Sequence, residues 1–108
     1  MNETQVIAAI TSLPRVATDD RTTEQQLIYT VDGQMFAIIK HGSNPLALSL
    51  LCDRNLSRLL ESQYESVLPG QGLSKQWITI LLTGQLSNED IIDQIRHAYE
   101  QAHTPDNA

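Results

Sequence analysis

The sequence has little of several residue types, and each scarcity excludes a class of protein. Cys52 is the one cysteine among 108 residues, so no disulfide can form within the chain and sites that need paired cysteines are excluded. No apolar run approaches the length of a transmembrane helix, and no secretory leader pattern opens the sequence. These absences predict a single domain over residues 1–108, in the cytoplasm and without a membrane anchor.

Basic residues are also scarce. The chain carries 7 Lys and Arg against 13 Asp and Glu, for a net charge of −6. After residue 84 the only basic residue other than histidine is Arg96, among several acidic ones. This balance favours solubility and opposes non-specific attraction to phosphate backbones.

The clearest pattern that is present is a run of three short strands. They are predicted at Leu27–Val31, Gln34–Lys40 and Leu46–Leu51. Asp32 and Gly33 join the first two strands, and Asp-Gly between apolar runs is typical of a type I′ hairpin turn, in which both central residues have positive φ.

A two-residue turn predicts a register and therefore two faces of the sheet. Tyr29 would lie opposite Phe36, and Ile38 opposite both Leu27 and Leu48. The face expected to form the core then holds Leu27, Tyr29, Val31, Phe36, Ile38, Leu46, Leu48 and Leu50. The other face holds Ile28, Thr30, Met35, Ala37, Ile39, Ala47, Ser49 and Leu51.

Helical patterns flank these strands. The predicted elements are a helix over 3–13 capped by Asn2, a polar loop over 14–26, a helix over Arg54–Gln63 capped by Asp53, a short strand over Tyr64–Leu68, a strand over Trp77–Thr83, a helix capped by Ser87, and a frayed tail over 103–108. This order predicts an α+β fold, a two-layer sandwich whose antiparallel sheet carries helices on one face.

Three segments together resemble the MmcQ/YjbR family. They are Leu27-Ile-Tyr-Thr-Val-Asp-Gly-Gln-Met-Phe-Ala-Ile-Ile39, Leu48-Ser-Leu-Leu-Cys52 and Leu73-Ser-Lys-Gln-Trp-Ile-Thr79, and the resemblance extends over nearly the whole chain. It implies the order α-β(3)-α-β(2)-α, with Tyr64–Leu68 as the fourth strand, and a DNA-binding role. Two departures stand out: Gln76 replaces the histidine that usually precedes the tryptophan, and the polar run Thr18–Gln26 replaces an aromatic-glycine element.

DNA is therefore one candidate partner. Lys75, Arg54, Arg58 and Lys40 would contact phosphates, and Trp77 would stack on a base. The alternatives are that these cations are solvated surface charges and that Trp77 packs at a sheet edge.

A second hypothesis places a homodimer or protein interface on the non-core face of the sheet. The residues expected there are Ile28, Met35, Ile39, Leu51 and Leu81, with Trp77 and Thr79 beside them. Such an apolar patch is larger than a soluble monomer usually leaves uncovered. A partner, a ligand or the folded-back loop Thr18–Gln26 could cover it, and the loop is the weakest of the three because it has few apolar side chains.

The remaining motifs favour no cofactor, no metal and no catalytic residue. Gly70–Lys75 lacks the spacing of a phosphate-binding loop. The histidines lack metal-ligand spacing, and the acidic cluster that begins at Glu89 is explained by capping at a helix N-terminus. No paired nucleophile and base is visible, so the sequence favours a binding module over an enzyme.

Overall fold

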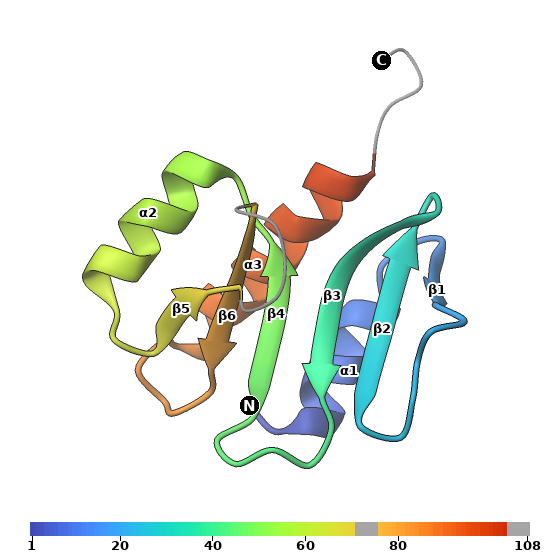
Figure 1. Cartoon of the computed structure of the whole chain (residues 1–108), viewed down its shortest axis with the longest axis horizontal. Coiled ribbons are helices and arrows are strands. Elements are labelled where there is room, and N and C mark those ends of the chain that lie inside the picture. Colours follow the sequence, from blue (N-terminus) through green and yellow to red (C-terminus); the bar gives the residue numbers. More distant parts are fainter. Residues whose placement is uncertain (71–75, 104–108) are drawn as a thin grey trace.

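The computed structural model describes residues 1–70 and 76–103. Within these residues it has three helices and one six-stranded antiparallel sheet with the strand order β1-β2-β3-β4-β6-β5 (Figure 1). The elements are α1 (Glu3–Thr11), β1 (Val16–Thr18), β2 (Gln26–Val31), β3 (Gln34–Lys40), β4 (Ala47–Leu51), α2 (Arg54–Gln63), β5 (Val67–Pro69), β6 (Trp77–Leu81) and α3 (Asn88–Ala102). The predicted α+β class is confirmed.

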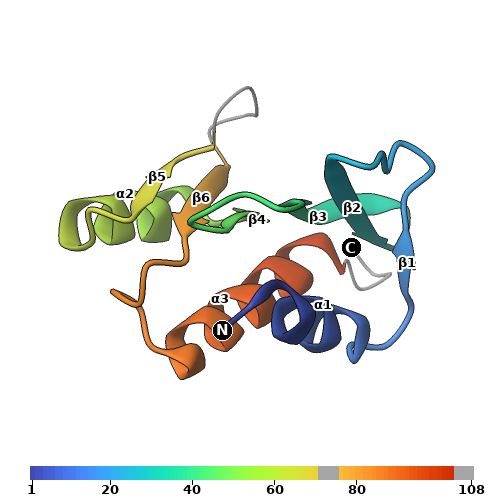
Figure 2. The ribbon, with the colours of Figure 1, turned by 90° about the horizontal axis from the view of Figure 1, so that it is seen from below.

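The elements form two layers. Figure 2 shows α1 and α3 on one face of the sheet, whereas α2 lies beyond the β5 edge. The core fills the space between α3 and the central strands, and its fully buried side chains include Val6, Ile10, Phe36, Ile39, Leu48, Leu50, Ile78, Ile80 and Ile95. No helix in the described part of the chain is long and apolar enough to cross a membrane.

All three helices begin with the caps that the sequence predicts. The side chain of Asn2 accepts a hydrogen bond from the backbone of Gln5, whose own side chain accepts from Asn2, so α1 has a complete capping box. Asp53 accepts two backbone N–H groups at the start of α2, and Ser87 accepts the N–H of Asp90 at the start of α3. These bonds satisfy N–H groups that a helix start otherwise leaves unpaired.

The predicted hairpin turn is confirmed. Asp32 has φ 52° and Gly33 has φ 81°, so both central residues are in the left-handed region, and Val31 lies opposite Gln34. The turn is tied to the end of α3, because Nδ1 of His103 lies 2.6 Å from Oδ2 of Asp32.

The predicted register, however, is wrong beyond the turn. A bulge lies between Thr30, which faces Met35, and Tyr29, which faces Ala37, so Phe36 is an extra residue in β3. Phe36 and Ala37 are both fully buried. The bulge shifts the rest of β3 by one residue, and a shift of one residue exchanges the two faces of a strand.

The exchange is clearest at two neighbouring isoleucines. Ile39 faces Leu27 and Leu48 in the register and is fully buried, whereas Ile38 faces Ile28 and Ser49 and is only partly buried. Ile39 therefore belongs to the core face and Ile38 to the other face, the reverse of the prediction.

Element boundaries also differ in places. The predicted loop 14–26 contains β1, which pairs with β2 because Val16 and Thr18 suit an extended edge strand. Helix α1 ends at Thr11, two residues before the predicted end, and the fourth predicted strand is displaced to Val67–Pro69. The predicted frayed tail lies outside the described residues from position 104 onward.

Candidate functional site

The sheet face that the helices leave open carries a hollow of about 300 Å³ across strands β3, β4 and β6. It is called the open-face hollow below. Its lining comes from five strands and consists of Gln26, Ile38, Lys40, Ala47, Ser49, Leu68, Thr79 and Leu81. None of these side chains is fully buried, so the hollow is accessible from solvent.

The floor of the open-face hollow is polar at its centre and apolar around it. Ser49 and Thr79 are partners in the register of β4 and β6, and their hydroxyl oxygens lie 2.9 Å apart. The same row of the sheet continues to Ile38 on one side and Leu68 on the other. The hollow therefore offers hydrocarbon contacts together with hydroxyl groups that can still accept or donate a hydrogen bond.

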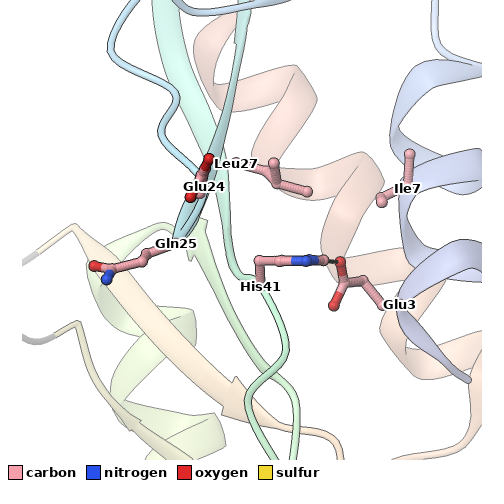
Figure 3. Close-up of a pocket in the computed structure, with 6 residues that line it drawn as sticks. All are labelled: Glu3, Ile7, Glu24, Gln25, Leu27 and His41. Atoms are coloured by element: carbon pink, nitrogen blue, oxygen red, sulfur yellow. Dashed lines mark hydrogen bonds and ion pairs between the residues drawn. The ribbon is translucent and has the colours of Figure 1, made fainter.

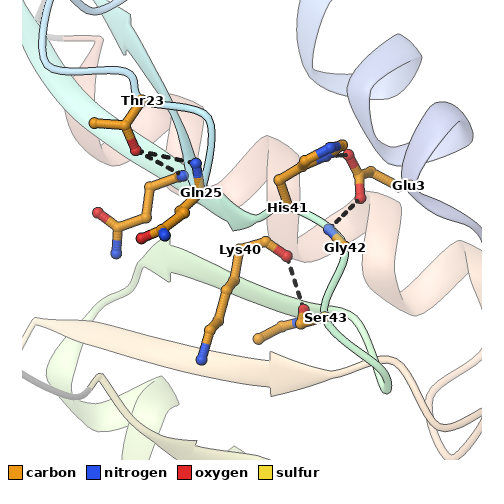
Figure 4. A network of polar contacts seen from close by, with 9 residues as sticks. Glu3, Thr23, Gln25, Lys40, His41, Gly42 and Ser43 are labelled. Atoms are coloured by element: carbon orange, nitrogen blue, oxygen red, sulfur yellow. Dashed lines mark hydrogen bonds and ion pairs between the residues drawn. The ribbon is translucent and has the colours of Figure 1, made fainter.

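One cation stands at the rim. Lys40 is the last residue of β3, and Figure 4 shows its side chain reaching out over the neighbouring strands. Within the described residues the Lys40 ammonium forms no ion pair, and no carboxylate lines the hollow. The lining of the hollow thus carries one positive and no negative side chain, in a chain whose net charge is −6.

The other predicted DNA contacts do not converge on Lys40. Arg54 and Arg58 are exposed on α2, which follows the far end of β4. Lys40 lies opposite Ala47, at the near end of that strand, and five residues of strand span about 13 Å. Trp77 is only 7% exposed, which favours the packing interpretation over a stacking platform. Lys75 lies outside the described residues.

The predicted interface residues are also divided. Leu81 lines the open-face hollow, and Met35 is half-buried outside it. Ile28 and Leu51 are only 7% and 6% exposed, so neither offers much surface to a partner, and the placement of Ile39 on this face is wrong because the bulge turns it into the core.

The loop Thr18–Gln26, expected to be the weakest of the three possible covers, is hydrogen-bonded to the edge of β2, and Gln26 is its contribution to the lining of the hollow. The backbone N–H of Asp19 donates to the carbonyl of Ile28, and the N–H of Ile28 donates to Oγ1 of Thr22 at 3.0 Å. Polar and backbone groups make these contacts at the strand edge, and they do not bury the apolar side chains of the open face.

Sequence reasoning missed the centre of the hollow. Ile38 was assigned to the core and Gln26 and Leu68 were given no role, whereas Ser49 and Thr79 were placed on this face without being recognised as its polar centre. A signal was nevertheless present, because Ser49 and Thr79 each interrupt an otherwise apolar strand at a position that points away from the core. A hydroxyl pair across adjacent strands is a recurrent cross-strand contact.

Comparison with known proteins decides the family. Residues 11–101 match the family model described as YjbR. The chain belongs to the YjbR family. It is 34% identical over 73 residues to the Escherichia coli K12 protein named "Uncharacterized protein YjbR", and the protein of the same name from E. coli O157:H7 matches equally. That match covers 67% of this chain and 62% of the relative, so the chain aligns with somewhat less than two thirds of the relative's length.

Solved structures agree on the fold. A Deinococcus radiodurans protein with a DUF419 domain superposes with a TM-score of 0.84 at 23% identity, covering 95% of this chain and 79% of that one. A Pseudomonas syringae protein superposes with a TM-score of 0.78 at 19% identity, covering 94% of this chain and 99% of that one. The YjbR-family chain therefore shares the architecture of both.

Proposed function

We propose that this YjbR-family protein is a non-catalytic binding module that docks a segment of a partner protein in the open-face hollow. The observation that carries the proposal is the combination of an accessible, half-apolar hollow with Lys40, a cation that has no ion-pair partner among the described residues. A segment that fits would present an apolar side chain to Ile38 and Leu81 and a carboxylate to Lys40.

The shape and charge of this face favour a different protein over a second copy of the chain. A two-fold dimer brings the same patch of each subunit together, so hollow would meet hollow. The lining includes Lys40 but no carboxylate that could receive the Lys40 of the other copy. A convex, acidic segment of a different protein therefore complements this surface better than a second copy of the chain does.

The edges of the sheet favour docking on the face over strand addition. Both edge strands have three residues, and Pro69 ends β5. Short edge strands and edge prolines hinder pairing with a further strand, because they offer few free backbone groups. The face is therefore the better binding surface.

The proposal that the module is non-catalytic is supported by how its reactive groups are placed. The hydroxyls of Ser49 and Thr79 pair with each other, and His41 pairs with Glu3. Burial raises the pKa of the Cys52 thiol to about 11, so this thiol is a poor nucleophile at neutral pH. Among the described residues these contacts place no base beside a nucleophile.

A peptide selection tests the proposed function. A library of random peptides of about twelve residues would be selected on the wild-type protein alone, and the affinity of the enriched peptides would then be measured for Thr79→Arg, which fills the hollow. We expect enrichment of peptides that pair a carboxylate with a large apolar residue, with dissociation constants in the micromolar range, about −8 kcal/mol. Binding should weaken about tenfold in Lys40→Glu, because attraction is replaced by repulsion.

Arg58→Glu on α2 is the matched control, because it makes the same charge change on an exposed side chain outside the hollow. It should leave peptide binding unchanged, and amide NMR spectra should show that all three variants are folded. Peptides that bind Thr79→Arg as tightly as wild type would refute docking in the hollow. Concentration-dependent sedimentation abolished by Thr79→Arg would instead identify a second copy as the occupant.

DNA binding, the role that the family resemblance implies, is a second candidate. The observation in its favour is that Arg54 and Arg58 are both exposed and lie four residues apart on α2, hence on one helical face. With so few cations available, binding should be weak and should fall steeply with salt. Fluorescence anisotropy with duplex and single-stranded DNA tests it: Arg58→Glu should reduce binding, and no binding of either DNA at low salt would exclude this role.

A further inference from the structure

A second pocket lies on the helix-covered face of the sheet, at the end where β2 begins. It lies between α1 and the start of β2, has a volume of about 610 Å³, and is lined by Glu3, Ile7, Glu24, Gln25, Leu27 and His41 (Figure 3). Because these residues lie on the helix-covered side, the pocket does not belong to the open-face hollow, although Lys40 and His41 are consecutive.

The walls of this pocket are apolar. Figure 3 shows Ile7 of α1 and Leu27 of β2 pointing toward one another, and both side chains are partly exposed. Gln25 points away from Ile7 in the same view. The space between helix and strand can therefore hold a hydrocarbon stem, and covering these two side chains would remove apolar surface from water.

The rim is acidic. Glu3 is held in place because its carboxylate accepts the N–H of Gly42 at 3.0 Å and pairs with His41 (Figure 4). These bonds, first that of Gly42 and then that of His41, lower the pKa of Glu3 below its usual value. Glu24 also lines the pocket, and its carboxylate forms no ion pair within the part of the chain that the structure describes.

We propose that this pocket binds an organic cation on a hydrocarbon stem, such as an alkylamine or the side chain of lysine or arginine. The stem would lie between Ile7 and Leu27, and the cationic head would reach the carboxylate of Glu24. The lining holds two carboxylates, those of Glu3 and Glu24, and one imidazole, so the charge at the rim favours a cation over an anion.

An NMR titration with hexylammonium tests this site. We expect saturable shifts of the amides of Ile7, Leu27 and Gly42 with a dissociation constant in the millimolar range, so additions up to about 20 mM suffice. Hexanol has the same stem without the charge and hexanoate reverses the charge, and both should bind at least about threefold more weakly. Hexanol or hexanoate binding as tightly as hexylammonium, or no saturable shift at all, would overturn the proposal.

Variants and a second probe complete the test. Glu24→Gln should weaken hexylammonium binding about threefold, whereas Glu100→Gln, an exposed carboxylate change on α3, should not. Equally weakened hexylammonium binding in both variants, or unchanged binding in Glu24→Gln, would show that the Glu24 carboxylate does not hold the cation. An acetylated arginine amide bound more tightly than hexylammonium would identify a peptide side chain as the source of the cation, and the reverse order would identify a free amine.

Discussion

Replacing Gly33 is a stringent test of the hairpin that organises the sheet. Gly33 has φ 81°, and a Cβ added there would meet no atom within 4 Å. A substitution at this site therefore changes backbone conformational energy without a steric clash. A residue with a Cβ in the left-handed region costs about 1–2 kcal/mol, and a β-branched residue costs more. The expected order of stability is glycine, then asparagine, alanine and valine.

The size of the effect is readily measured. With a urea m-value of about 1–2 kcal/mol/M, Gly33→Ala should lower the denaturation midpoint by about 1 M. The melting temperature should fall by about 4–8 °C for each kcal/mol lost. Asparagine adopts positive φ more readily than alanine, so Gly33→Asn should recover part of the loss.

The order of stability among these variants can refute this explanation. Valine as stable as glycine, or asparagine less stable than alanine, would show that backbone conformation does not limit stability at this turn. Asp32 is a poorer probe, because its carboxylate pairs with both Arg15 and His103, and a substitution there would break these contacts as well.

Three further outcomes are expected. Gly70→Ala should destabilise by about 1–3 kcal/mol in urea unfolding for a steric reason, because the added Cβ would lie 2.6 Å from Cβ of Trp77. Glu3→Gln should make stability fall less steeply on acidification. Folding lowers the pKa of Glu3 below 4.5, so the carboxylate contributes stability above pH 4.5 and loses it as the pH drops through the folded pKa. Urea midpoints measured at several pH values would show the difference. Cys52 should resist alkylation at pH 8 in the native protein and react in urea, as followed by mass spectrometry, because its thiol is buried and its pKa is raised to about 11.

Much of the fold was readable from local sequence. Caps, the Asp32-Gly33 turn and the α2 boundaries depend on short-range chemistry, in which a side chain meets backbone groups two or three residues away. The core positions of β4 and β6 were also predicted, because Leu48, Leu50 and Ile78 alternate with residues that face outward.

The bulge was not readable in this way. No glycine marks it, and Phe36 occupies the extra position because its ring packs edge-on against Tyr99 of α3, with centroids 5.9 Å apart. This contact joins residues far apart in sequence, so a pattern within one strand cannot reveal it. The open-face hollow was only partly predicted for the same reason, since Ile38 reaches this face through the register beyond the bulge, whereas Leu81 was expected there.

The position of α3 as the last helix has a consequence for how the chain folds during synthesis. Most neighbouring strands are also consecutive in sequence, so the sheet can begin to assemble from local pairs as they leave the ribosome. Although α1 lies on the same face, the part of the core face that β3 and β4 form stays uncovered until residues 88–102 have emerged, because α3 packs on these two strands. A nascent chain that stalls before residue 88 would expose Leu48, Leu50, Ile78 and Ile80 together, and would be a substrate for chaperones that hold unfinished apolar sheets.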